Sequence, residues 1–211
     1  SGLTLGQQFR EYPELLSSRR FWGYSMASGF CSGAFFAYLG GGPFVGSVVF
    51  GLSPKWVGFL FGAPAIGYFL GNWITGKNAQ RLGVNKLILW GTIAVSSGCF
   101  VMLLLFLAGF GSPLVFFGLM TCVGLGNGLV IPNATAGMLS VRPHLAGTAS
   151  GLGGAIMIGG GAALASLAGF LLSPETGAYP LILIMLGTAL AALVAILAVI
   201  RREERLQGTL R

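Results

Sequence analysis

The chain has 211 residues, of which 55% are hydrophobic and 8% are charged, whereas about 25% of the residues in an ordinary soluble domain are charged. This composition excludes a soluble globular domain and a disordered chain, and the glycines follow no Gly-X-Y period, which excludes collagen. The net charge of +7 would suggest nucleic acid as the partner of a soluble chain. Here the cations lie between apolar runs, so we expect the lipid bilayer and its anionic headgroups as the partner, and no nucleic acid.

Six apolar runs are long enough to cross a bilayer, which takes about 20 residues of helix. They predict an all-α membrane protein with six transmembrane helices, preceded by a leader or linker (1–20) and followed by a basic tail (201–211). The predicted spans are 21–42, 56–76, 87–108, 113–140, 146–172 and 177–200.

The cations predict the orientation of the spans. Eleven of the twelve Lys and Arg residues fall in the leader, the second and fourth connections and the tail, which leaves Lys55 alone on the other side. Short cytoplasmic loops collect Lys and Arg, and an even number of spans puts both ends on one side. We therefore expect both termini to be cytoplasmic.

The first two spans each carry a face of small residues, which lets membrane helices approach closely. At 100° per residue, Phe35 and Tyr38 lie nearly opposite that face in the first span. The aromatic face either lines a cavity or faces lipid, and the sequence leaves both possibilities open. The small residues are Gly29, Gly33, Ala37 and Gly41 in the first span and Ala63, Gly67 and Gly71 in the second.

The fourth span contains a proline and two asparagines. Pro132 cannot donate a hydrogen bond to the carbonyl of Gly128, so we expect a kink there. Asn127 falls near the middle of the span and Asn133 lies one to two turns further on. Polar side chains at such depth usually turn toward a cavity or a partner. The alternative is an interhelical hydrogen bond that serves packing alone.

The fifth span, which contains "GTASGLGGAIMIGGGAALASLAG", has an almost continuous face of small residues at helical spacing. Such a face predicts close helix packing, and its several glycines predict a helix that bends easily. The candidate packing residues are Gly147, Gly151, Gly154, Gly161 and Ala165.

Enzymatic alternatives find little support in the sequence. The stretch "GTASG" has the spelling of a hydrolase nucleophile motif around Ser150, but the single histidine, His144, lies in a predicted loop. Cys31, Cys99 and Cys122 fall inside apolar runs without metal-ligand spacing. We expect no catalytic residue, no metal and no cofactor.

Two stretches carry a family resemblance: "SRRFWGYSMASGFCSGAFFAYLGGGPFVG" and "GLGNGLVIPNATAGMLSVRPHLAGTASGLGGA". They closely resemble the C-terminal half of bacterial drug:proton antiporters of the Bcr/CflA type (bicyclomycin and chloramphenicol resistance), within the major facilitator superfamily. The resemblance covers essentially the whole chain. It implies half of a fold in which two six-helix halves, each made of two inverted three-helix repeats, rock around a midplane site.

The connection "GKNAQRLGVNK" resembles the loop signature of that superfamily, Gly-x-x-x-Asp-Arg-x-Gly-Arg. Gly76, Arg81 and Gly83 match the signature, whereas Gln80 replaces its acid and Val84 its second arginine. We interpret the connection as a positively charged cytoplasmic loop rather than a gate.

The resemblance further implies multidrug efflux from the bacterial inner membrane in exchange for protons. The first, second, fourth and fifth helices would line the cavity or the seam between halves, and the small face of the fifth would meet an N-terminal half. All five acids lie outside the spans, so the coupling proton would be bound by that other half. The alternative is a self-sufficient half-transporter or channel that works as a homodimer. The candidate cavity residues for small apolar drugs are Phe35, Tyr38, Tyr68, Asn72, Asn127 and Met157.

Overall fold

The structure is a computed structural model, and it describes residues 5–209. Within that range all regular elements are helical, and six segments are long and apolar enough to cross a membrane, which confirms the predicted fold class. The elements are α1 (Leu5–Leu16), α2 (Arg19–Phe44), the π-helical turn η1 (Val45–Val49), α3 (Pro54–Phe61), α4 (Ala63–Leu82), α5 (Val84–Leu107), α6 (Pro113–Val141), the 3-10 turn η2 (Pro143–Leu145), α7 (Ala146–Leu171) and α8 (Tyr179–Gly208).

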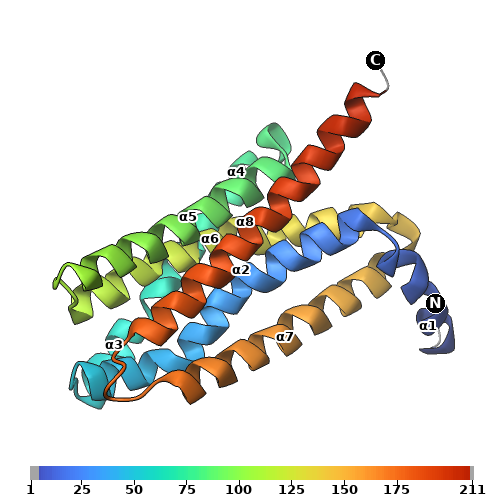
Figure 1. Ribbon diagram of the computed structural model, residues 1–211. Helices are drawn as coiled ribbons and strands as arrows, with labels where there is room; N and C mark the ends of the chain where they lie inside the picture. The colour runs from blue at the N-terminus through green and yellow to red at the C-terminus, as the bar shows by residue number, and fades with distance from the viewer. Residues whose placement is uncertain (1–4, 210–211) are drawn as a thin grey trace.

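The long helices lie side by side (Figure 1). In chain order they form two interlocked groups of three, α2, α4 and α5 in one group and α6, α7 and α8 in the other. The first helix of one group, α2, packs most extensively against α7 and α8 of the other group. In the same way α6, the first helix of the second group, packs against α4 and α5, and α2 and α6 also contact each other. Each group therefore has its first helix clasped by the second and third helices of the other, as expected for two three-helix repeats.

Several helix ends differ from the predicted spans. The second span, predicted as 56–76, is broken at Gly62 into α3 and α4, because Pro64 favours the first turn of a new helix. The α4 helix then runs to Leu82, so the predicted loop is helical until Gly83, whose φ of +84° ends it. The α8 helix likewise continues through most of the predicted tail.

Two backbone carbonyls lack their usual helical hydrogen-bond partner, one at the α3–α4 break and one before Pro132 in α6. A hydroxyl of another helix donates a hydrogen bond to each of them. Tyr38 on α2 donates to the carbonyl oxygen of Phe61 at the α3–α4 break, over 3.0 Å. Thr75 on α4 donates to the carbonyl oxygen of Gly128, the one that Pro132 cannot reach, over 3.0 Å. Such substitutes are needed because lipid offers no hydrogen bonds.

The closest helix packing is between α4 and α6. A Cβ added to Gly67 would collide with the backbone of α6 at Thr121, and one added to Gly124 would collide with the α4 backbone at Pro64. Gly71 and Gly128 face each other one turn further along, where an added Cβ on Gly71 would lie 2.8 Å from the Gly128 Cα. The predicted small face of the second span thus packs against glycines of the fourth.

The small face predicted for α7 is only partly used within the chain. Gly161 lies against the ring of Phe36 on α2. The backbone of Ala165 lies 2.5 Å from a Cβ built on Gly40, which is also on α2. In contrast, added Cβ atoms on Gly147, Gly151 and Gly154 would meet nothing within 4 Å. These three glycines make no close contact inside this chain, because α7 turns that part of its face outward. Their contact with an N-terminal half stays a prediction.

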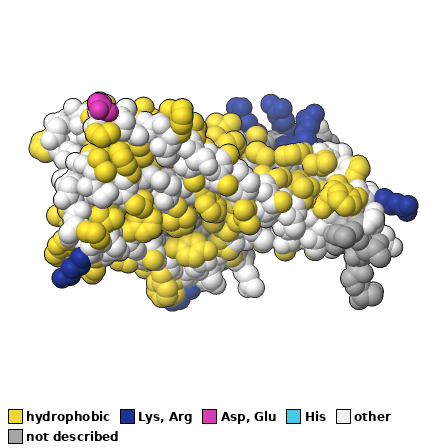
Figure 2. All heavy atoms as spheres, turned by 90° about the horizontal axis from the view of Figure 1, so that it is seen from below, with side chains coloured by type: hydrophobic (Ala, Val, Ile, Leu, Met, Phe, Trp, Pro, Cys, Tyr) yellow, Lys and Arg dark blue, Asp and Glu magenta, His cyan; other side chains and the backbone are white. Residues whose placement is uncertain are grey.

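Most charged side chains lie at one end of the bundle, which we call the charged end; it comprises the starts of α2 and α7, the α4–α5 turn, η2 and the end of α8 (Figure 2). There Tyr24 on α2 donates to Asn85 of α5 over 2.6 Å, and Asn85 donates to Glu203 of α8 over 2.7 Å. The Glu203 carboxylate also lies 3.5 Å from Arg20 Nε. This chain of contacts joins three helices that are distant in sequence.

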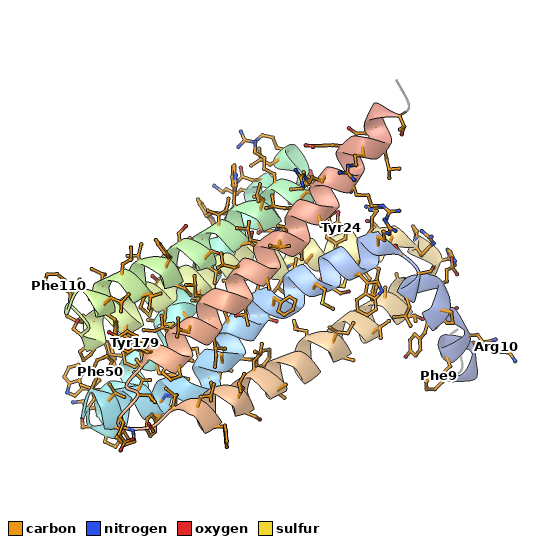
Figure 3. The ribbon with its side chains drawn as sticks, in the orientation of Figure 1. Phe9, Arg10, Tyr24, Phe50, Phe110 and Tyr179 are labelled. Carbon is orange, nitrogen blue, oxygen red and sulfur yellow. The ribbon has the colours of Figure 1, made fainter. Side chains whose placement is uncertain are left out.

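The leader is tied to the same end. Its helix α1 places Glu14 3.2 Å from Arg142 Nε and 3.5 Å from His144 Nε2, and Glu11 accepts a 2.6 Å hydrogen bond from Thr148. Phe50, Phe110 and Tyr179 mark the opposite end of the bundle (Figure 3).

Candidate functional site

A cavity of about 520 Å³ lies where the two three-helix groups meet. This volume falls in the range of small-molecule sites, roughly 300–1,000 Å³. Its walls come from α2, α4, α6 and α7, and the α3–α4 break contributes Phe61 and Gly62. The lining residues are Ser32, Phe35, Phe36, Leu39, Phe61, Gly62, Pro64, Ala65, Tyr68, Gly124, Asn127, Ile131 and Met157.

The lining is largely apolar and aromatic, and it includes no Asp, Glu, Lys, Arg or His. Ser32, Tyr68 and Asn127 bring the side-chain hydroxyl and amide groups of the wall. Ser32 already donates to the Gly29 carbonyl of its own helix over 3.2 Å. The cavity therefore suits an apolar molecule with a small number of polar groups.

Asn127 is the most distinctive of the polar groups. Its amide nitrogen donates to the Val123 carbonyl over 2.8 Å, which fixes the side chain against its own helix. The residue is 4% exposed, and its Oδ1 is buried without a hydrogen-bond partner. A buried acceptor without a partner costs about 1–3 kcal/mol.

The structure brings four of the six candidate cavity residues together. Phe35, Tyr68, Asn127 and Met157, each on a different helix, all line the cavity. Tyr38 and Asn72 do not belong to its lining.

These two residues make other contacts. Tyr38 is fully buried, with its ring stacked on Phe61 at a centroid distance of 4.8 Å, so it supports the wall from behind. Asn72 lies one turn beyond Tyr68 and donates to the Tyr68 carbonyl over 2.9 Å, which satisfies its own helix. Asn133 also turns away from the cavity lining: it donates to Leu129 and to Thr75 Oγ1, over 2.6 and 3.2 Å.

Several lining residues that the sequence did not predict lie at the α3–α4 break. Phe61, Gly62 and Pro64 lie inside a span that is predicted as one continuous helix. The signal was present in the order Gly-Ala-Pro, since a proline in a first helical turn often marks a helix start. Phe36 and Leu39 extend the aromatic face of α2 to a neighbouring stripe.

The cavity lies between the two helices that the chain leaves least covered. In their most apolar stretches, 17% of the residues of the α3–α4 segment and 11% of those of the α7 segment are buried, against 39–56% in the other four. Exposed apolar side chains on these two helices include Phe69 on α4 and Ile158 on α7. The open glycines Gly147 and Gly151 also lie on α7.

The loop-signature residues do not form a separate site within the described residues. Arg81 donates to Asn78 over 2.9 Å in the last turns of α4 and has no carboxylate partner there. Gly76 is exposed in the helix and Gly83 forms the turn. No group of three or more His, Cys, Asp or Glu side chains in residues 5–209 is placed to hold a metal ion.

A bundle of six membrane-spanning helices in two interlocked repeats, with an uncharged cavity between them, has the architecture of a membrane transporter. Residues 4–166 match the Major Facilitator Superfamily, and the chain belongs to this family. The membership points to transport rather than catalysis.

Two curated bacterial proteins are similar to the chain. An uncharacterized MFS-type transporter of Bacillus subtilis (strain 168), YdgK, is 28% identical over 187 residues, which are 88% of this chain and 45% of that protein. Multidrug resistance protein D of Escherichia coli (strain K12) is 32% identical over 141 residues, which are 65% of this chain and 34% of that protein. The chain thus spans less than half the length of these relatives. No solved structure gave a significant match.

Proposed function

We propose that the chain is the C-terminal six-helix half of a multidrug efflux transporter of the bacterial inner membrane, and that its cavity binds apolar, drug-like molecules. The observation that carries this proposal is the cavity between the two repeats, with its aromatic walls and the free Asn127 acceptor. Aromatic and methionine surfaces adapt to ligands of different shape, which suits a transporter of varied drugs. The similarity to a multidrug resistance protein supports the same substrate class.

The other half of the transporter would cover the face of α4 and α7. This face has the least burial in the chain, and it borders the cavity. The open glycines of α7 would give the second half a close approach there, as small residues do between membrane helices. A second copy of this chain could use the same face, which is the homodimer alternative.

Proton coupling, in this proposal, belongs to the other half. Between residues 21 and 200 the sequence has a single carboxylate, Glu175, in the connection before α8. Glu11, Glu14 and Glu203 make polar contacts at the charged end, and none of them lines the cavity. An intramembrane ionisable group, which antiporters of protons need, is thus expected outside this chain.

The proposed orientation places the charged end in the cytoplasm. A cysteine replacing Gln80 is expected to react with a membrane-impermeant maleimide only in inside-out vesicles, and one replacing Ser53 only in right-side-out vesicles. The reason is that Lys and Arg near helix ends are retained on the cytoplasmic side. The reversed labelling pattern would overturn the orientation.

Binding to the cavity can be tested with chloramphenicol, a neutral aromatic molecule with hydroxyl and amide donors. The chain in lipid nanodiscs is expected to bind it saturably, and Ala65→Trp, which fills the cavity, should abolish binding. Asn127→Leu should weaken binding about tenfold, since one buried hydrogen bond is lost. Equilibrium dialysis with radiolabelled drug measures all three.

Leu183→Trp is the matched control, because Leu183 is an exposed apolar residue of α8 outside the cavity. It should bind like the unchanged chain. Equal binding by Ala65→Trp and Leu183→Trp, or no saturable binding at all, would contradict the proposal. Native mass measurement of the same samples separates the alternatives: a dimer that Gly151→Leu dissociates would favour the homodimer over a separate N-terminal half.

A further inference from the structure

A second hollow, of about 1,070 Å³, lies between α2 and α8 at the charged end. Its mouth is strongly basic, and one acid, Glu204, is among its lining residues. The basic residues of the mouth are Arg19, Arg20, Arg201, Arg202 and Arg205. We call this feature the α2–α8 groove.

The groove follows from how the two helices meet. Gly23 lets α2 approach α8 closely, since a Cβ added there would collide with the Val199 side chain. Beyond this contact α8 continues past the start of α2 and away from α1 (Figure 1). The final turns of α8 therefore carry their arginines beside the first turn of α2, where nitrogen-bearing side chains gather near Tyr24 (Figure 3).

Most of these positive charges are not neutralised by the protein. Within the described chain, Arg20 has a carboxylate within 4 Å, namely Glu203, which also accepts a hydrogen bond from Asn85. The other four arginines of the mouth have no ion pair there. The Nη1 atom of Arg202 is buried and has no hydrogen-bond partner. The mouth thus offers unfilled donors to an anion.

The inner part of the groove is apolar and lies along the membrane-spanning part of α8. It includes Val194, Leu197 and Ala198, and the first two are 66% and 42% exposed. A soluble anion would use the basic mouth and leave this apolar floor uncovered. A phospholipid matches both parts, because its phosphate meets cations at the membrane boundary while its acyl chain lies along apolar side chains.

We propose that the α2–α8 groove is a binding site for an anionic phospholipid, whose phosphate contacts Arg201, Arg202 and Arg19 and whose acyl chain lies along Val194 and Leu197. This site is separate from the transport cavity, with which it shares no lining residue. The bound lipid would lie at the junction of α2 and α8. The same junction is held together by the hydrogen bonds of Tyr24, Asn85 and Glu203.

The test uses the purified chain in mild detergent with three additives at matched concentration: phosphatidylglycerol, phosphatidylcholine and inorganic phosphate. Native mass spectrometry is expected to show phosphatidylglycerol bound at least about tenfold more tightly than phosphatidylcholine, with no bound inorganic phosphate. Arg201→Gln/Arg202→Gln should lower the affinity for phosphatidylglycerol about tenfold, because two charge-assisted contacts are lost. Arg201→Gln/Arg205→Gln, which keeps the half-buried Arg202, should weaken binding in the same direction.

Lys77→Gln/Arg81→Gln is the matched control, since these two cations lie at the same end of the bundle but on α4. It should leave the affinity for phosphatidylglycerol unchanged, and circular dichroism should show all variants folded. An equal loss in the control and groove variants would show attraction by overall charge and overturn the site. Binding of inorganic phosphate as tight as that of phosphatidylglycerol, or no effect of either arginine pair, would overturn it as well.

Discussion

Alanine at Gly67 or Gly124 is expected to destabilise the chain by at least about 3 kcal/mol, the upper part of the range for overpacking. At both positions the added methyl group meets backbone rather than a side chain that could rotate away: the Gly67 Cβ would lie 2.6 Å from the Leu125 nitrogen, and the Gly124 Cβ 2.9 Å from the Tyr68 nitrogen. The α4 and α6 helices would have to separate along their closest contact. Thermal unfolding in detergent, followed by circular dichroism, measures the loss.

Gly151→Ala is the matched control and should change stability in the opposite direction. An added Cβ meets nothing within 4 Å at that position, and alanine favours a helix over glycine by up to about 1 kcal/mol. The three variants make the same chemical change in membrane helices, so any difference reports the local packing. Equal melting temperatures for Gly124→Ala and Gly151→Ala would show that the α4–α6 contact is not close.

The glycines show how far the sequence could predict the fold. The six spans were accessible because a membrane helix must be apolar along about 20 residues, whatever its neighbours are. A small-residue face, in contrast, indicates that something approaches closely without indicating what. The faces of α4 and α7 look equivalent in sequence, yet Gly67 packs against α6 while Gly151 faces outward. The difference arises from the arrangement of the repeats, which a single helix does not encode.

The break at Gly62 and the long α8 helix were missed for related reasons. Hydropathy averages over a span, so a one-residue interruption between α3 and α4 leaves the average unchanged. The charged end of α8 is predicted as a tail, although Glu203 holds it against Asn85 and Arg20. Tertiary contacts thus extend the helix beyond the apolar segment.

Part of the candidate cavity could be predicted because residues on one face of a helix share the same surroundings. On α2, Ser32, Phe35, Phe36 and Leu39 share the stripe that lines the cavity. Tyr38 lies about 60° from Phe35 around the helix, by the 100° rotation of each residue. That angle turns its side chain into the seam with α3 and α6, and the helix orientation that decides this comes from packing.

Tyr38→Ala is expected to lower the free energy of unfolding by about 3–5 kcal/mol, the usual cost of removing a large buried aromatic side chain. The ring contacts four others: it stacks on Phe61, and its centroid lies 6.2 Å from those of Phe35 and Phe116 and 6.4 Å from that of Phe117. Its hydroxyl also donates a hydrogen bond to the Phe61 carbonyl at the α3–α4 break. Chemical or thermal unfolding in detergent measures the change.

Tyr38→Phe separates the two contributions of this side chain. The ring and its stacking remain, and the Phe61 carbonyl loses its donor, so the expected loss is about 1 kcal/mol. Because Phe61 forms part of the cavity wall, the phenylalanine variant should keep chloramphenicol affinity within about twofold while the wall stays in place. A direct ligand contact at Tyr38 gives the reverse pattern, in which Tyr38→Ala keeps its melting temperature and changes the affinity. That result would return Tyr38 to the substrate path and remove its assignment as a support of the α3–α4 break.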